Sequence, residues 1–230
     1  MCVTPSRNQG HPNTFPNLKA VKFCHRFRHP HAAADCFREI SMRHGTAAIL
    51  ANSSECGWGG HYPEGSRLFL DTFVAAWNGS LREAFLEGAQ AFLAHRTPLP
   101  EDDIVGGPHL CATAVVIERY RLTCAWIGGI HAVVLHEGRV RSRNQVHSIA
   151  NKLAADGLLS PEEADQHPYS RVLYRSISYG LSVEPDIEHW TLPKHGRLLL
   201  VSRPDEGQAI PGVRPDAEPL PCEGLVVHDW

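Results

Sequence analysis

The feature that most restricts the fold of this chain is a run of short apolar segments between residues 112 and 140. The segments 112–118, 121–127 and 131–140 are rich in Val, Ile, Leu and Ala, and two or three residues separate each from the next. Short apolar segments joined by tight connections are typical of consecutive antiparallel strands. The pattern therefore predicts an antiparallel meander of three strands.

Two amphipathic segments precede these strands and indicate a pair of helices. The first, near 66–77, places its large apolar side chains at near-helical spacing: Leu68, Phe69, Phe73 and Trp77. The second begins at Ser80, which lies three residues before Glu83 and matches the Ser-x-x-Glu pattern of a capping box. We expect the two helices to pack on a sheet through their apolar faces.

The remaining elements complete an α+β pattern. Residues 46–51 and 197–202 are short apolar runs that predict strands, and 225–230 predicts a last edge strand. A helix is expected near 147–156, with His147-Ser148 as its cap. Ser160, Pro161 and Glu163 predict the start of a further helix. Strands, a helix pair, more strands and another helical segment predict helices packed on antiparallel sheet.

Length and composition favour one globular domain and exclude several classes of partner. Residues 1–30 carry no apolar periodicity and are expected to form an irregular arm, with a domain over 31–230. A net charge of −3 gives no electrostatic case for nucleic acid or a membrane surface. No apolar run approaches the ~20 residues that span a bilayer, and the first residues do not resemble a secretory signal. The seven scattered cysteines predict free thiols in the cytoplasm.

Four segments resemble, in the same order, motifs of the metal-dependent type 2C protein phosphatase family. Residues 56–61 (CGWGGH) are similar to its DGMGGH loop, and 111–140 is similar to its strands around V-G-D-S-R. Residues 146–178 are similar to its segment from D-H-S to R-A-L-G, and 197–207 to R-L-L-L-C-S-D-G-L. The resemblance implies an αββα sandwich of two antiparallel sheets flanked by helices, shortened at the C-terminus.

The family resemblance also implies two divalent metal ions, which carboxylates bridge and which activate water for attack on phosphate. Of the acidic pair near the N-terminus, only Asp35 is present. The bridging Asp of the glycine loop falls on Cys56, beside Glu55, in one alignment and on Asn52 in another. Its partner glycine is Gly57 or Ser53, and this alternative stays open.

Two further ligand positions of the family carry no carboxylate. The Asp of V-G-D-S-R corresponds to Gly129, and the Asp of C-S-D-G corresponds to Arg203. A guanidinium stays protonated and cannot bind a metal ion. Its charge repels a cation at close range. We therefore expect no cofactor, with at most weak binding of Mn²⁺ or Mg²⁺ through the remnant Asp35.

These replacements favour a pseudophosphatase: a binding or regulatory module for a phosphoprotein, a kinase or a partner enzyme, or for an anionic ligand. The alternative from another class is a repurposed enzyme, or a weak residual protein phosphatase. The candidate catalytic residues of the repurposed cleft are Cys56, His61, His131 and Arg203. The candidate binding residues are Asn52, Glu55, Gly57 and Gly129.

Overall fold

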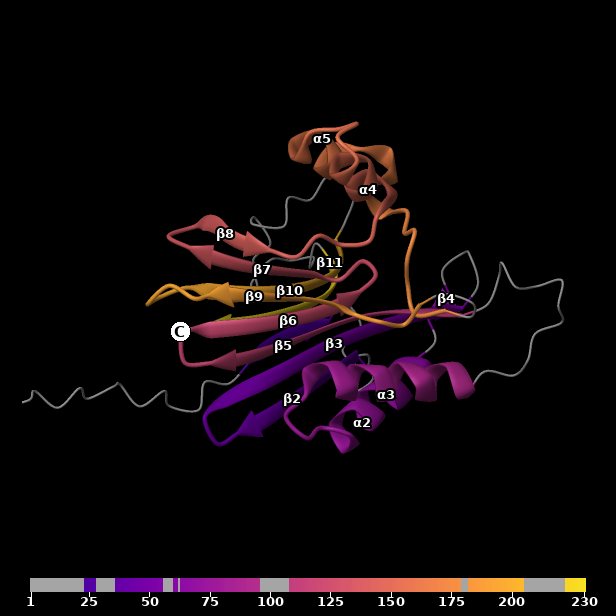
Figure 1. The fold of residues 1–230 in the computed structure, drawn as a ribbon, viewed down its shortest axis with the longest axis vertical. Helices are drawn as coiled ribbons and strands as arrows, with labels where there is room; N and C mark the ends of the chain where they lie inside the picture. Colours follow the sequence, from indigo (N-terminus) through magenta and orange to yellow (C-terminus); the bar gives the residue numbers. More distant parts are fainter. Residues whose placement is uncertain are drawn as a thin grey trace, which may run out of the picture.

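Two antiparallel sheets lie face to face and form the centre of the molecule (Figure 1). The structure is a computed structural model and describes residues 23–27, 36–55, 60–61, 63–95, 108–178, 182–204 and 222–230. The first sheet contains, in spatial order, β1 (Cys24–Phe27), β11 (Cys222–Asp229), β10 (Arg197–Pro204), β7 (His131–His136) and β8 (Arg139–Arg143). The second contains β2 (Phe37–Met42), β3 (Gly45–Glu55), β5 (His109–Glu118), β6 (Arg121–Ile127) and β9 (Asp186–Thr191), with β4 (Gly60–His61) paired to β3.

Helices lie outside both sheets. The helices α2 (Pro63–Ala75) and α3 (Leu81–Ala94) cover the outer face of the second sheet, whereas α4 (Ile149–Ala155) and α5 (Pro161–Gln166) lie beyond β8 (Figure 1). A 3₁₀ turn, η3 (Pro168–Arg171), follows α5. The arrangement confirms the predicted α+β sandwich.

Alternation along β3 explains how one strand joins two layers of the core. Ala48 and Leu50 pack between the two sheets, and Ala47 and Ile49 pack against the helix pair on the other face. All four side chains are fully buried. Full burial of a large aliphatic side chain is worth about 1.5–3 kcal/mol, so residues such as Leu50 and Ile49 hold the layers together.

The capping residues of the helices behave largely as predicted. In α5, Ser160 Oγ accepts from the Glu163 amide at 3.2 Å and the Ser160 amide donates to Glu163 Oε2 at 2.7 Å, which completes the capping box. In α3, Ser80 Oγ accepts from the Glu83 amide, but the Ser80 amide donates to Asn78 Oδ1 at 2.8 Å. Asn78 therefore accepts the hydrogen bond that the Glu83 side chain would accept in the predicted capping box.

The predicted meander over 112–140 is wrong. The hairpin of β5 and β6 belongs to the second sheet, and the hairpin of β7 and β8 belongs to the first. The chain crosses from one sheet to the other at 128–130, where Gly128 has a φ of +93°. A further turn at Glu137-Gly138 divides the segment predicted as one strand. Because β5, β6 and β7 are buried along most of their length, their apolar pattern cannot reveal which sheet each joins.

Both ends of the chain also differ from the prediction. The strand β11 lies between β1 and β10 and is not an edge strand. Part of the expected irregular arm forms β1, where Cys24 pairs with Val227 and Phe27 pairs with Gly224. Four residues are too few to show a period of two, and their partner strand lies at the opposite end of the sequence. Residues 1–22 and 28–30 of the expected arm lie outside the described residues.

Candidate functional site

Several predicted site residues come from strand ends that meet at one end of the sandwich, on the right in Figure 1. In the second sheet, Asn52 pairs with Cys111, and the neighbouring strand β6 ends directly before Gly128. In the first sheet, Val201 pairs with His131, so β10 runs on past the start of β7. All of these strand ends lie next to residues 128–130, where the chain crosses from the second sheet to the first.

The register places three ligand positions implied by the family resemblance at this shared end. Because β10 continues antiparallel to the chain before His131, the backbone of Arg203 lies on the side of Gly129. The strands β3 and β10 also contact each other across the sandwich. The backbones of Asn52, Gly129 and Arg203 therefore come to one end of the molecule although they are far apart in the sequence.

Other predicted residues are only partly described or not described. Asp35, Cys56 and Gly57 lie outside the described residues. The backbones of Glu55 and His61 belong to the pairing of β3 with β4, in which Glu55 lies opposite Gly60. This pairing places their backbones at the same end of the second sheet.

Asn52 and its neighbour Ser53 point to opposite faces of the second sheet. Asn52 lies two residues beyond Leu50, on the face between the sheets, and is 8% exposed. The Ser53 amide donates to Ser66 Oγ at 2.9 Å, and the two hydroxyl oxygens are 2.7 Å apart. Ser53 therefore connects β3 to α2, and of these two neighbours only Asn52 points to the inner face.

The structure separates the side chain of His131 from that of Asn52. Along β7, His131 shares its face with Val133 and Leu135, which belong to the apolar cluster on the outer face of the first sheet. Burial lowers the pKa of His131 to about 4, and the charge of Arg143 contributes to this shift. His131 is therefore neutral at pH 7, and the first sheet lies between it and the inner face that carries Asn52.

Hydrogen bonds to uncharged groups organise the crossover between the sheets. Thr113 Oγ1 and Asn144 Nδ2 each donate to the Ile130 carbonyl at 3.0 Å. Asn144 Oδ1 accepts from the Ala132 amide at 2.8 Å. Thr113 and Asn144 are buried, so these bonds satisfy polar groups that water does not reach. The crossover is therefore held from both sheets.

His147 joins the crossover to the helical segment that follows it. The Gly128 amide donates to His147 Nδ1 at 2.9 Å, so the imidazole carries its proton on Nε2 and donates it to Asp186 Oδ2 at 3.0 Å. Arg175 donates to Asp186 Oδ1 at 2.6 Å. The ring of His147 is 2% exposed and stacks at 6.2 Å on that of Trp126.

The protonation states of this network follow from its geometry. Burial lowers the pKa of His147, Asp186 opposes the shift, and the charge of Arg175 adds to it. Partial burial alone would raise the pKa of Asp186, but hydrogen bonds from His147 and Arg175 outweigh it and hold that pKa below its usual range. The network therefore contains a neutral imidazole, a carboxylate and a guanidinium at neutral pH.

Sequence reasoning found only part of this network. Ser148 is the predicted cap of α4, and its Oγ accepts from the Asn151 amide at 3.2 Å. The role of the preceding His147 depends on Asp186 and Arg175, which the sequence places in separate segments without a motif. A cavity of about 450 Å³ opens beside the network. Its lining includes Trp126, His147, Lys152, Tyr174, Asp186 and Glu188.

Neither a metal-binding cluster nor a helix suited to span a membrane occurs among the described residues. Within the described residues, His, Cys, Asp and Glu form no group of three or more that is arranged to hold a metal ion. None of the described helices has the length and apolar character that a membrane span requires.

Comparison with known proteins places the fold. No family model matches the chain. A 74-residue segment is 31% identical to a putative protein phosphatase 2C-type of Streptococcus pyogenes serotype M6, and the match covers 32% of this chain. The chain therefore spans less than a third (30%) of that curated relative.

Solved structures match over most of the chain. The serine/threonine phosphatase PstP/Ppp of Mycobacterium tuberculosis superposes with a TM-score of 0.65 at 20% identity, covering 91% of this chain and 97% of that one. The serine/threonine phosphatase of S. agalactiae gives 0.61 at 16% identity with the same coverage. A structure of the PstP catalytic domain in complex with two manganese ions gives 0.60 at 18% identity, also with coverage of 91% and 97%.

These matches define the class to which the fold belongs. The chain has the fold of the type 2C serine/threonine phosphatases, a sandwich of two antiparallel sheets between helices. The long final strand β11 is part of this fold, and it follows a segment, 205–221, that lies outside the described residues.

Proposed function

We propose that this chain is a pseudophosphatase, a degenerate member of the type 2C family that binds a partner but does not use two-metal chemistry. The observation that carries the proposal is the set of residues at the crossover end of the sandwich. Where the family resemblance implies metal-binding carboxylates, this end contains the backbones of Asn52, Gly129 and Arg203, and Cys56, the other residue aligned with the bridging Asp, lies outside the described residues.

The chemistry of these residues opposes a pair of hard metal ions. A related fold, the PstP catalytic domain, binds two manganese ions. Mn²⁺ and Mg²⁺ favour oxygen ligands, above all carboxylates. Gly129 supplies no side chain, Asn52 supplies a neutral amide, and Arg203 supplies a permanent positive charge. A site with this composition lacks the negative charge that would compensate two divalent cations.

The same composition favours an anion. A guanidinium presents a planar fork of donors that binds phosphate or carboxylate at two points. We therefore assign Arg203 to the binding of a phosphorylated or otherwise anionic group on a protein partner such as a phosphoprotein, a kinase or a related enzyme. We also propose a cytoplasmic location, because the seven cysteines of the sequence are scattered without the regular spacing of a disulfide framework.

Metal binding tests the proposal directly. Titration calorimetry with Mn²⁺ is expected to give no binding tighter than about millimolar, the weak end of the range for protein sites of hard cations. An aryl-phosphate assay with Mn²⁺ should show no turnover above the buffer rate. Binding of two manganese ions per chain with micromolar affinity, or metal-dependent turnover, would disprove the proposal.

Two variants separate the binding module from the repurposed enzyme. Arg203→Asp reverses the charge and should abolish binding of inorganic phosphate or a phosphopeptide. Cys56→Ser is the matched change at the other candidate position and should leave anion binding intact. If Cys56→Ser removes an activity while the circular dichroism spectrum is unchanged, the thiol takes part in catalysis and the protein is a repurposed enzyme.

A further inference from the structure

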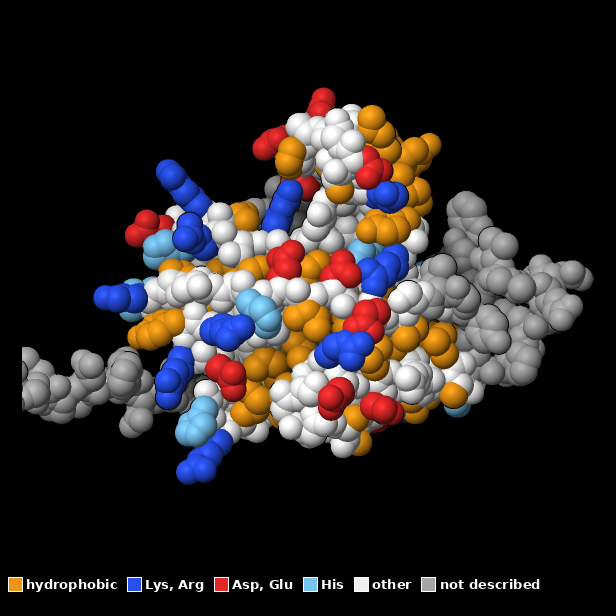
Figure 2. All heavy atoms as spheres, in the orientation of Figure 1, with side chains coloured by type: hydrophobic (Ala, Val, Ile, Leu, Met, Phe, Trp, Pro, Cys, Tyr) orange, Lys and Arg blue, Asp and Glu red, His pale blue; other side chains and the backbone are white. Residues whose placement is uncertain are grey.

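The end of the sandwich opposite the crossover is formed by hairpin tips and is rich in cations. Figure 2 shows Lys and Arg side chains along the left border of the molecule, where these tips lie. The exposed basic residues of the connections and their flanks are Arg43, His44, Arg119, Arg121, Arg139, Arg141, Lys194 and His195. We call this set the basic end. The whole chain has a net charge of −3, so its charges are segregated.

The tips that form the basic end are in contact with one another. His44 precedes Gly45, which pairs with Glu118 at the start of the neighbouring turn. In that turn, the Tyr120 carbonyl accepts from the amide of Leu192 at 2.7 Å. The following connection places the His195 carbonyl 2.8 Å from Nδ1 of His136, next to the β7–β8 turn. The basic end is therefore a continuous surface across both sheets.

A hollow of about 510 Å³ lies in this surface, between the β2–β3 and β5–β6 tips. It is lined by His44, Glu118, Arg119, Tyr120 and Arg121. Tyr120 is 48% exposed, which is high for a large aromatic side chain. The hollow thus offers two guanidinium groups, an imidazole and a phenol ring within one depression, with one carboxylate at its side.

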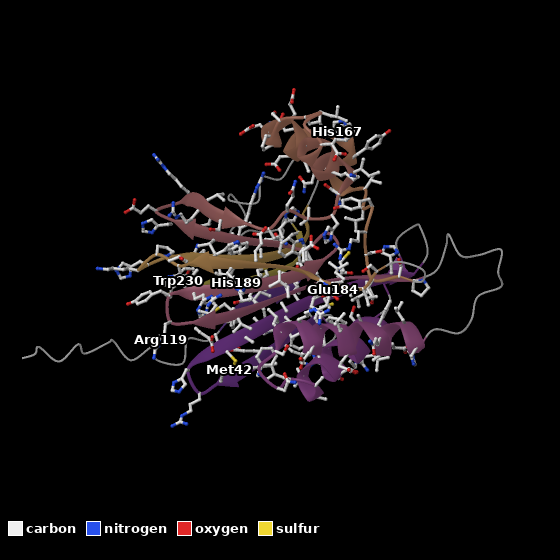
Figure 3. The ribbon with its side chains drawn as sticks, viewed as in Figure 1. Met42, Arg119, His167, Glu184, His189 and Trp230 are labelled. Carbon is white, nitrogen blue, oxygen red and sulfur yellow. The ribbon has the colours of Figure 1, made fainter. Side chains whose placement is uncertain are left out.

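The residue at the tip of this hollow adopts a backbone conformation that disfavours a side chain. Arg119 has a φ of 55°, in the left-handed region where glycine is the preferred residue. Figure 3 places Arg119 at the same end of the molecule as Trp230, away from Glu184. Left-handed backbone at a non-glycine residue motivates a functional hypothesis for its side chain. Here that side chain brings a positive charge to the hollow.

We propose that the basic end is a docking surface for an acidic segment of a partner protein. Each arginine can hold a carboxylate at two points, and the hollow accommodates a few side chains. Glu118 and Glu137 are exposed among the cations, so the surface has mixed charge. A continuous row of phosphates would meet repulsion from these carboxylates, whereas a peptide can place its acidic groups between them.

Charge reversal tests this surface. Binding of a fluorescein-labelled oligoglutamate peptide is measured by anisotropy at low and at physiological salt. Arg119→Glu and Arg121→Glu should each weaken binding by about tenfold. Arg171→Glu, an exposed charge reversal on η3, is the control and should leave the affinity within about twofold. Equal affinity of all four proteins for the peptide would overturn the proposal.

A pair of glycine variants keeps the test valid if the glutamate variants do not fold. Arg119 and Glu137 both have left-handed φ at hairpin tips, so Arg119→Gly and Glu137→Gly should both raise the melting temperature. Only Arg119→Gly should weaken peptide binding, because Glu137→Gly removes a negative charge. If both variants change the affinity alike, charge at the hollow does not determine binding and the proposal fails.

Two further probes decide the class of partner. Duplex DNA and vesicles containing phosphatidylserine are compared with the peptide at equal concentration of negative charge. The proposal requires that the peptide binds more tightly than either. Tighter binding of DNA or of vesicles that depends on Arg119 would replace the protein partner by nucleic acid or by a membrane.

Discussion

Gly128 offers a direct test of how the two sheets are joined. Its φ is +93°, and a Cβ atom added there would lie 2.3 Å from Cys111 Sγ and 2.8 Å from Cys111 Cβ. An L-residue in left-handed conformation costs roughly 1–2 kcal/mol. Overpacking of a dense core costs a further 1–3 kcal/mol or so. Gly128→Ala should therefore lower the free energy of unfolding by roughly 2–5 kcal/mol.

A second glycine isolates the steric part of this loss. Gly138 has a φ of +74°, and an added Cβ would meet no atom within 4 Å. Gly138→Ala should therefore cost only the conformational term, roughly 1–2 kcal/mol. Urea denaturation at pH 7, followed by tryptophan fluorescence and circular dichroism, measures both. Equal losses for the two variants would refute the close approach of Gly128 to Cys111.

Three other predictions concern the neighbouring groups. The pKa of His131 is about 4 in the folded protein against 6.5 for the free side chain. The free energy of unfolding should therefore be full above about pH 6.5 and fall by at most roughly 3 kcal/mol as the pH decreases toward 4. His131→Gln should flatten this pH dependence, as measured by urea denaturation. Asp186→Asn should destabilise the fold by roughly 1–3 kcal/mol, because Arg175 loses its charged partner. Ser148→Ala should cost about 1 kcal/mol through the lost cap of α4, measured in the same way.

Local signals in the sequence predicted the helices and most of the strands. Ser160 and Glu163 lie within one turn of each other, so the pattern that predicts their capping box also contains all the atoms that form it. The apolar faces of α2 and α3 follow from helical spacing in the same way. Such elements depend on residues that are close in sequence, and a single sequence displays them fully.

The division of strands between the two sheets lay beyond the same reasoning. Val115 packs between the sheets, and Val116 packs toward the helices, yet both are apolar. A strand that is buried on both faces shows no alternation from which its neighbours can be inferred. The pairing of β1 with β11 escaped prediction for a related reason: its register depends on residues at opposite ends of the chain.

The residues of the candidate site were likewise predicted only in part. The family resemblance brought together Asn52, Gly129 and Arg203, and the register of the sheets places their backbones at one end. The resemblance did not show that His131 points away from Asn52. His131 lies two residues before Val133 on the same strand, so both side chains point to the outer face of the first sheet. Motif similarity thus locates strand ends, whereas the side to which each residue points requires the pairing and the core packing.

The crossover also explains how this fold is held together if no metal ion occupies it. In a two-metal site, the carboxylates at the strand ends repel one another unless cations compensate them. Here the Ile130 carbonyl accepts from Thr113 and Asn144, and the Gly128 amide donates to His147. Each of these partners is uncharged at neutral pH, so none needs a cation to balance it. The strand ends of both sheets are therefore joined by hydrogen bonds within the protein.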